Sequence, residues 1–168
     1  MELRCLSERD MPQALLAHQE LAAEEFDFLP GYDPGTEWKD FLELVEAARQ
    51  GRRLPASHVA ATFLIAEAEN HIVGRVTIRH RLTPFLRTVG GHIGYVVRPG
   101  FRRRGYAQQM LGLALIEAKR LRIDQALLTC DAHNDASRTV IEKCGGVLEA
   151  PLETDAAMTM KLRYWIDT

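Results

Sequence analysis

The sequence lacks the features typical of disulfide-rich, metal-bound and membrane proteins. Only three cysteines occur among 168 residues, Cys5, Cys130 and Cys144, and their odd number without C-x-x-C spacing argues against a disulfide framework or a zinc site. The longest apolar stretch, residues 59–66, is far shorter than the roughly 18 residues of a membrane-spanning helix. The chain also does not begin with a cationic segment followed by an apolar one, the pattern of a signal peptide. We therefore expect a cytoplasmic protein with reduced cysteines, no bound metal and no membrane contact.

Net charge is small but strongly segregated along the chain. The formal charge is -2, yet residues 1–50 hold 12 acidic and 4 basic side chains, whereas residues 75–122 hold 11 basic and one acidic. The basic segment predicts a bound anion. A long nucleic acid is disfavoured, because the acidic first third would repel its phosphates and the basic residues lack interleaved aromatics. A small polyphosphate ligand fits this charge pattern better.

Apolar periodicity and turn residues predict one domain over residues 1–168, and the 46% hydrophobic content is enough for a real core. Strands are expected at residues 2–6, 59–69, 72–82, 92–98, 125–131 and 158–166. Helices are expected at about residues 8–21, 38–48, 107–121 and 135–143. The strand–helix–strand unit from 92 to 131 implies a right-handed crossover and a locally parallel pair. The predicted fold class is α+β, with a single mixed sheet of about six to seven strands and helices on both faces.

A cluster of arginines lies where a predicted strand meets a predicted helix N-terminus. The first turn of a helix leaves about four backbone N–H groups unpaired and bears a partial positive charge, so a phosphate is stabilised there. Gly105 and Ala107 would let the backbone approach such a ligand closely. The sequence contains no P-loop and no Rossmann fingerprint. An anion site is predicted, and a surface arginine cluster at a helix cap is the alternative; the arginines are Arg98, Arg102, Arg103 and Arg104.

These residues resemble a known signature. Arg102-x-x-Gly105-x-Ala107 is similar to the [Q/R]-x-x-G-x-[G/A] motif with which the GNAT superfamily of N-acetyltransferases binds the pyrophosphate of acetyl-CoA. The strand at residues 92–99 resembles the central strand of that family, and Asn134-x-x-Ser137 with Glu142-Lys143-x-Gly145 resembles its C-terminal half. The similarity covers residues 72–150, and the nearest group is a poorly characterised bacterial one with GGHIGY and IEK-x-GG stretches.

The resemblance implies a GNAT fold, acetyl-CoA as co-substrate and an amine as acceptor. It also implies that the central strand and the strand at 125–131 diverge, and that the pantetheine arm lies in the gap. Backbone groups near Val96 and Val97 would pair with that arm, and Asn134 would contact its amides. The cofactor-binding residues it implies are Val96, Val97, Arg102, Arg103, Arg104, Gly105, Tyr106, Ala107, Asn134, Ser137 and Lys143.

The catalytic groups are harder to assign. Amine acetylation needs a neutral nitrogen, and several members of the family use a carboxylate on the central strand as the base. Here that place holds His92, whose unperturbed pKa of about 6.5 suits a base, although a histidine satisfied by sheet backbone is an equal alternative. His80 is the second candidate. Ile141 stands where the family commonly has the tyrosine that protonates the CoA thiolate, so water, Tyr95 or Tyr106 would replace it, or the thiolate leaves unprotonated.

Three further questions stay open at this level. Cys130 on the second diverging strand could form an acetyl-cysteine, but the resemblance implies direct transfer. A non-catalytic acyl-CoA-binding or sensing module is the alternative to an enzyme, and a monomer and a homodimer are both compatible with the sequence. The acidic N-terminal residues favour a cationic acceptor, unless they form an ordinary solvated face; they are Glu20, Glu24, Glu25, Asp27, Asp33 and Glu37.

Overall fold

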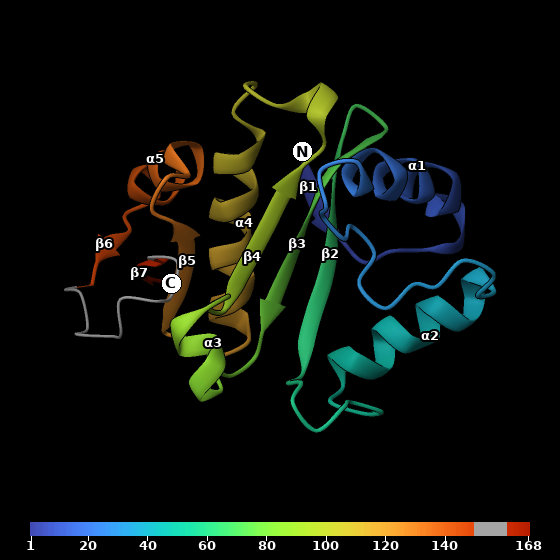
Figure 1. Ribbon diagram of the computed structural model, residues 1–168, viewed down its shortest axis with the longest axis horizontal. Helices are drawn as coiled ribbons and strands as arrows, with labels where there is room; N and C mark the ends of the chain where they lie inside the picture. The colour runs from blue at the N-terminus through green and yellow to red at the C-terminus, as the bar shows by residue number, and fades with distance from the viewer. Residues whose placement is uncertain (150–160) are drawn as a thin grey trace.

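The computed structural model describes residues 1–149 and 161–168, and its strands form two sheets (Figure 1). The first sheet has the order β1-β2-β3-β4 and comprises β1 (Glu2–Arg4), β2 (Ala61–Ala68), β3 (His71–Arg79) and β4 (Ile93–Val97). The second has the order β5-β7-β6 and comprises β5 (Gln125–Asp131), β6 (Val147–Leu148) and β7 (Lys161–Asp167). The predicted α+β class is confirmed. The expected single mixed sheet is corrected to two sheets, in which every described strand pair is antiparallel.

The predicted helices are confirmed, with small shifts at their ends. They are α1 (Met11–Ala22), α2 (Trp38–Arg49), α4 (Tyr106–Arg120) and α5 (Asp135–Lys143). A short helix, α3 (Pro84–Thr88), and the two-residue strand β6 were not predicted, because each is too short to show a periodicity. The last strand is confirmed from Lys161 onward, and the predicted residues 158–160 lie outside the described part of the chain.

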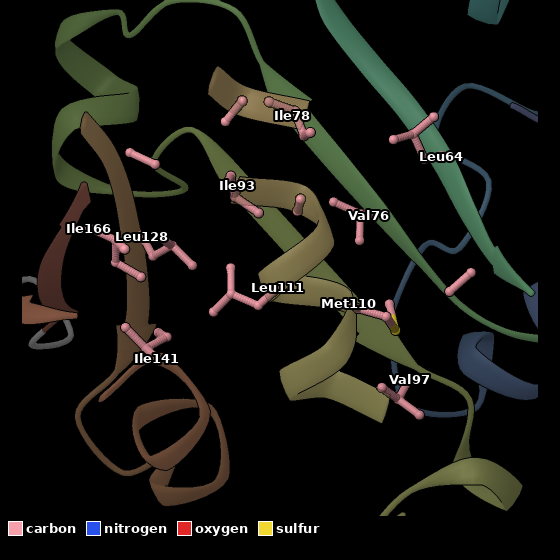
Figure 2. Close-up of a cluster of buried hydrophobic side chains, with 14 of the residues drawn as sticks. Leu64, Val76, Ile78, Ile93, Val97, Met110, Leu111, Leu128, Ile141 and Ile166 are labelled. Carbon is pink, nitrogen blue, oxygen red and sulfur yellow. The ribbon is translucent and has the colours of Figure 1, made fainter. Parts of the chain in front are cut away.

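Side chains on the two faces of the first sheet enter separate cores. On one face, α4 places Met110 and Leu111 against Val76 and Ile78 of β3, and this core continues to β5 and β7 (Figure 2). On the other face, α1 and α2 pack on β3 and β2 around residues such as Phe41. Burying each large apolar side chain contributes about 1.5–3 kcal/mol, so both helix layers are strongly held. Since side chains along a strand alternate between its two faces, the β3 residues adjacent to Val76 and Ile78 point away from α4.

The two sheets meet at the start of β4, in a contact that we call the vertex, formed by Gly90, Gly91 and His92 with Leu127 and Thr129. His92 donates its N–H to the Leu127 carbonyl at 2.7 Å, and the Gly90 N–H donates to Thr129 Oγ1 at 2.8 Å. Gly91 has a φ of 60°, and a Cβ there would lie 2.3 Å from the Leu127 oxygen, so only glycine fits. Beyond the vertex no backbone hydrogen bond joins β4 to β5 in the described chain, and the predicted parallel pair is reduced to this contact.

β4 is therefore the edge strand of the first sheet on the side that faces β5 (Figure 1).

No helix among the described residues is both long and apolar enough to cross a membrane.

Candidate functional site

The loop before α4 presents a row of unused backbone donors. Gly105 caps the helix with a φ of 78°, and Arg103 also has a positive φ, of 62°. In the described part of the chain, none of the six consecutive N–H groups from residue 103 to residue 108 donates to a protein acceptor. Left-handed residues at a helix N-terminus turn such N–H groups toward one point, which creates an anion-binding concavity. We call this segment, residues 103–108, the cradle.

The cradle forms one wall of a cavity of about 920 Å³, near the upper end of the range for small-molecule sites. β4 and α5 form the other walls. Every predicted cofactor-binding residue except Arg104 lines this cavity, and a Cβ on Gly105 would meet only Gln109 Nε2 at 3.9 Å. The space at Gly105 is therefore left open by the protein. The predicted residues that the structure brings together here are Val96, Val97, Arg102, Arg103, Gly105, Tyr106, Ala107, Asn134, Ser137 and Lys143.

Two arginines of the cluster are engaged with the region of α1. Arg98 is 5% exposed, donates twice to the Glu20 carboxylate at 2.8 Å, and also donates to the Ile72 carbonyl. Arg102 donates to both carboxylate oxygens of Glu24, at 2.9 and 2.6 Å. These hydrogen bonds hold the pKa of each carboxyl below its usual value. Arg98 is thus buried in an ion pair, and Arg102 combines an ion pair with a place in the cavity wall.

The other two arginines make no carboxylate ion pair within residues 1–149 and 161–168. Arg103 lines the cavity, so its guanidinium is available to an anion. Arg104 lies over the Phe101 ring, with its guanidinium carbon 5.8 Å from the ring centre, and it does not line the cavity. Phe101 itself lines the cavity and was not predicted, since an isolated aromatic residue in a loop carries no periodic signal.

On the opposite wall, polar groups of β4 and α5 come together. Asn134 caps α5 by accepting a hydrogen bond from the Ser137 N–H at 2.9 Å, which leaves its amide NH2 as a donor. The Tyr95 hydroxyl lies 3.2 Å from Ser137 Oγ. Burial is the main cause that raises the pKa of Tyr95 to about 12, so this phenol keeps its proton at neutral pH. Ile141, at the place of the family tyrosine, is 1% exposed in the core.

The two candidate bases lie outside the cavity wall. His92 is 8% exposed, and its Nδ1 accepts a hydrogen bond from the Leu127 N–H at 3.0 Å. Burial, together with the charges of Arg87 and Arg79, lowers the pKa of His92. His80 pairs its Nε2 with Thr62 Oγ1 at 2.8 Å. The geometry of His92 favours the structural alternative, because the ring lone pair that a base needs is already used.

Cys130 is buried on β5, and burial raises the pKa of its thiol. A protonated thiol is a poor nucleophile, which favours direct transfer over an acetyl-cysteine. In the described residues no group of three or more His, Cys, Asp or Glu side chains could hold a metal ion.

The comparisons with known proteins agree with this architecture. The family model described as "Acetyltransferase (GNAT) domain" matches residues 1–147. A search of curated proteins finds no match.

Many solved structures share the fold. The yncA protein of Salmonella typhimurium, solved with its cofactor acetyl-CoA, has a TM-score of 0.63 at 15% identity, covering 99% of this chain and 92% of its own. A ribosomal-protein-alanine N-acetyltransferase from Brucella melitensis has a TM-score of 0.61 at 19% identity, covering 98% of each chain. A chimera of the Vibrio cholerae spermidine N-acetyltransferase SpeG and hSSAT has a TM-score of 0.63 at 16% identity, covering 99% and 96%.

The family model covers most of the chain. The structure also has a cradle at the start of α4, an open edge of β4 and two diverging sheets. The protein belongs to the GNAT acetyltransferase family.

Proposed function

We propose that the protein transfers the acetyl group of acetyl-CoA directly to the nitrogen of a primary amine. The observation that carries this proposal is the cradle: six adjacent N–H groups without an acceptor in the described residues, at the N-terminus of α4, in the wall of a cavity beside the open edge of β4. The pyrophosphate of CoA satisfies these donors and interacts favourably with the helix dipole. Arg103 adds a charge-assisted contact from its free guanidinium.

The acyl arm of the cofactor fits the gap between β4 and β5. Beyond the vertex no described strand pairs with β4 on this side. The backbone groups of Val97 and Tyr95 face the gap, whereas those of Val96 are directed at β3, so the pairing with the amides of pantetheine expected near Val96 and Val97 is best placed at Val97 and Tyr95. The NH2 group of Asn134 would donate to the same arm from the opposite wall. This arrangement directs the thioester toward the vertex, where the two strands meet.

In the transfer step, the amine nitrogen forms a bond to the thioester carbon and the carbon–sulfur bond breaks. The departing thiolate takes a proton from Tyr95, whose hydroxyl is protonated at neutral pH and is paired with Ser137 in the cavity wall. The Tyr95–Ser137 pair therefore supplies the proton to the thiolate, which the apolar side chain of Ile141 cannot supply. Before the attack the ammonium loses one proton to water, because His92 would first have to release the Leu127 N–H before it could act as a base. After the carbon–nitrogen bond forms, the nitrogen loses its second proton, which water returns to the Tyr95 phenolate.

The alternative, a non-catalytic acyl-CoA-binding module, rests on the apolar Ile141 alone. Since Tyr95 and Ser137 place hydroxyl groups in the same cavity, the absence of the family tyrosine does not remove the proton donor. The catalytic reading is therefore the better supported one.

Two measurements on the intact chain test the proposal. Acetyl-CoA and desulfo-CoA should both raise the melting temperature, because a ligand at about a hundredfold excess over its Kd stabilises the folded state by about 2.7 kcal/mol. Acetyl-CoA with a panel of primary amines should release a free thiol. A protein that binds acetyl-CoA but releases no thiol with any amine would be a binding module, and one that shows no shift at millimolar ligand would lack the cofactor site.

A further inference from the structure

The face of the first sheet that points away from α4 carries two arginines of β3, which are separated by one residue on that face. Val76 and Ile78 enter the core under α4, so by alternation Arg75, Thr77 and Arg79 lie on the opposite face. Thr77 is paired in register with Gly94 of β4. A side chain at Gly94 would lie over this face, and its absence leaves the strand open beside the arginines.

Arg79 is half-buried, and no acidic side chain within residues 1–149 and 161–168 pairs with it. Its Nη1 donates to the carbonyls of Gly90 and Gly91 at 3.1 and 3.2 Å, and the described chain offers no carboxylate to its Nε or Nη2. A Cβ on Gly94 would lie 3.8 Å from this Nη1, so the guanidinium lies directly beside the open strand. Burial lowers the pKa of Arg79.

Arg75 is more deeply buried, at 8% exposure, and is also incompletely paired. Its Nη1 donates to Thr77 Oγ1 and its Nη2 to the Asp27 carbonyl, both at 2.8 Å, while its Nε is buried without a hydrogen-bond partner in the described structure. Burial lowers the pKa of Arg75 to about 10, and the positive charge of Arg79 contributes to the shift, against the attraction of Asp27. A buried donor without an acceptor is costly, and so is a pair of like charges.

The position of this face relative to the cofactor cavity suggests what would compensate the two charges. Gly94 lies between His92 of the vertex and Val96, which lines the cavity on the other side of the same strand. A molecule bound over Gly94 would therefore lie next to the point toward which the thioester is directed. α1 and α2 pack mainly on β3 and β2. Their core reaches Val96 of β4, while Gly94 stays partly exposed.

We propose that Arg79 binds an anionic group of the acceptor, a carboxylate or a phosphate, and that the buried charge of Arg75 adds to the attraction, so that the substrate is an amine that also carries a negative charge. The inference rests on the proposed function and names its substrate class. It replaces the cationic acceptor expected from the acidic N-terminal residues, of which Glu20 and Glu24 are already neutralised by Arg98 and Arg102. A guanidinium suits both anions, since its planar fork donates two parallel hydrogen bonds.

Matched pairs of amines test the proposal through thiol release from acetyl-CoA. Each amino acid in a panel is compared with its own amide, and phosphoethanolamine is compared with ethanolamine; spermidine serves as the cationic acceptor. The amide has the lower amine pKa and hence more free amine, so a preference for the acid opposes intrinsic reactivity. We expect kcat/KM to favour the anionic member of a pair by about tenfold to a hundredfold, because charged hydrogen bonds are lost in the neutral one. The two sets of pairs distinguish carboxylate from phosphate.

Variants locate the effect. Arg79→Gln should reduce the preference to about twofold or less, whereas Arg120→Gln, which removes an equal charge from the exposed end of α4, should leave it intact. Gly94→Val keeps every arginine and covers the open strand, so it should lower activity with anionic amines even if Arg79→Gln fails to fold. Equal rates for acid and amide in the parent protein, or a preference for spermidine over every anionic amine, would overturn the proposal.

A binding measurement separates this proposal from the transfer reaction. The Nε–Hε NMR signals of Arg75 and Arg79 are followed during titration with N-acetylglycine, N-acetylglycinamide and N-acetylphosphoethanolamine. Shifts with an anionic compound but not with the amide support the anion site even if no amine is acetylated, in which case only the proposed function fails. The absence of any shift at saturating concentrations of all three would overturn the anion site, whatever the protein does with acetyl-CoA.

Discussion

The cradle and the vertex lie at opposite ends of the gap between β4 and β5, and they differ in how their backbone hydrogen-bonding groups are used. The cradle is contiguous in sequence and leaves six N–H groups without protein acceptors in the described structure. The vertex joins residues about 35 positions apart and satisfies its polar groups internally, with His92 both donating to and accepting from Leu127. One end has the free donors that we propose bind the cofactor, and the other holds the two sheets together. Substitutions at the two ends should therefore change different measurements.

The largest effect should come from Gly105→Glu in the cradle. The new side chain would occupy the open space in which the pyrophosphate is proposed to bind, and its charge would repel the phosphates. The positive φ of Gly105 adds strain. We expect CoA affinity to fall by about a hundredfold or more, measured by calorimetry, with circular dichroism to confirm that the fold is retained.

Gly112→Glu is the matched control, because Gly112 lies on the same helix and a Cβ there would meet no atom within 4 Å apart from the neighbouring helix backbone. It adds the same charge and should leave CoA affinity within about twofold of the parent. Parental affinity in a folded Gly105→Glu protein would place the phosphates elsewhere.

A smaller effect, confined to turnover, should follow from Tyr95→Phe. Loss of a general acid typically lowers the rate by about 10²- to 10⁴-fold, and the neighbouring Ser137 and water should keep the loss near the lower end. Because the hydroxyl acts on the leaving thiolate, kcat should fall while the Kd of acetyl-CoA stays nearly constant. Phe keeps the buried ring, so a loss of stability that matches the loss of rate would show that Tyr95 is structural only.

At the vertex, His92→Ala should act mainly on stability. It leaves the buried Leu127 N–H without an acceptor, which costs about 1–3 kcal/mol of unfolding free energy. His92→Asn can return an acceptor oxygen near the place of Nδ1 and should recover part of that loss. Denaturant unfolding measures both. If instead His92→Ala lowered turnover about a hundredfold at unchanged stability, with partial rescue at alkaline pH, the histidine would be the base after all.

The same histidine gives a pH dependence with a defined sign. Its folded pKa is lowered, so the folded state prefers the neutral ring. The stability from its bond to Leu127 is fully present above the unfolded pKa of about 6.5 and is lost as pH falls through the folded pKa. Unfolding free energy should decrease on acidification below about pH 6.5, and His92→Asn should remove that part of the decrease. An unchanged profile in the variant would assign the acid sensitivity to other groups.

The same contrast explains how far the sequence could predict this molecule. The cradle was predictable because a helix N-terminus, its preceding glycine and the arginines are neighbours in the sequence, and their signature resembles a known family. The longer helices were predictable from their periodicity. The structural role of His92 was not decidable, because its partner Leu127 lies on a strand reached only after α4. The split into two sheets was likewise hidden, since hydrogen bonding between strands is set by distant residues such as Gly91 against Leu127.

The arginine cluster shows the same limit on a smaller scale. Arg98 and Arg103 are close in sequence and were predicted to act together. In the structure Arg98 pairs with Glu20, whereas Arg103 lies in the cavity wall. A signal was present: Arg98 and Arg102 are four residues apart, and so are their partners Glu20 and Glu24. That matching spacing has meaning only once α1 is known to lie beside the loop.

The smallest predicted effect is the difference in CoA affinity between variants of Arg103, in the cradle, and of the neighbouring Arg102. Arg103→Gln removes a guanidinium that has no carboxylate partner in the described chain, so CoA affinity should fall about three- to tenfold, and the loss should shrink as salt screens the charge. Arg102→Gln removes a guanidinium held by Glu24, and affinity should change by about twofold or less. Calorimetry at two salt concentrations measures both. If Arg102→Gln lowers CoA affinity more than Arg103→Gln does, the phosphates must replace Glu24 as the partner of Arg102. Glu24→Gln should then tighten CoA binding, because it removes the competing anion.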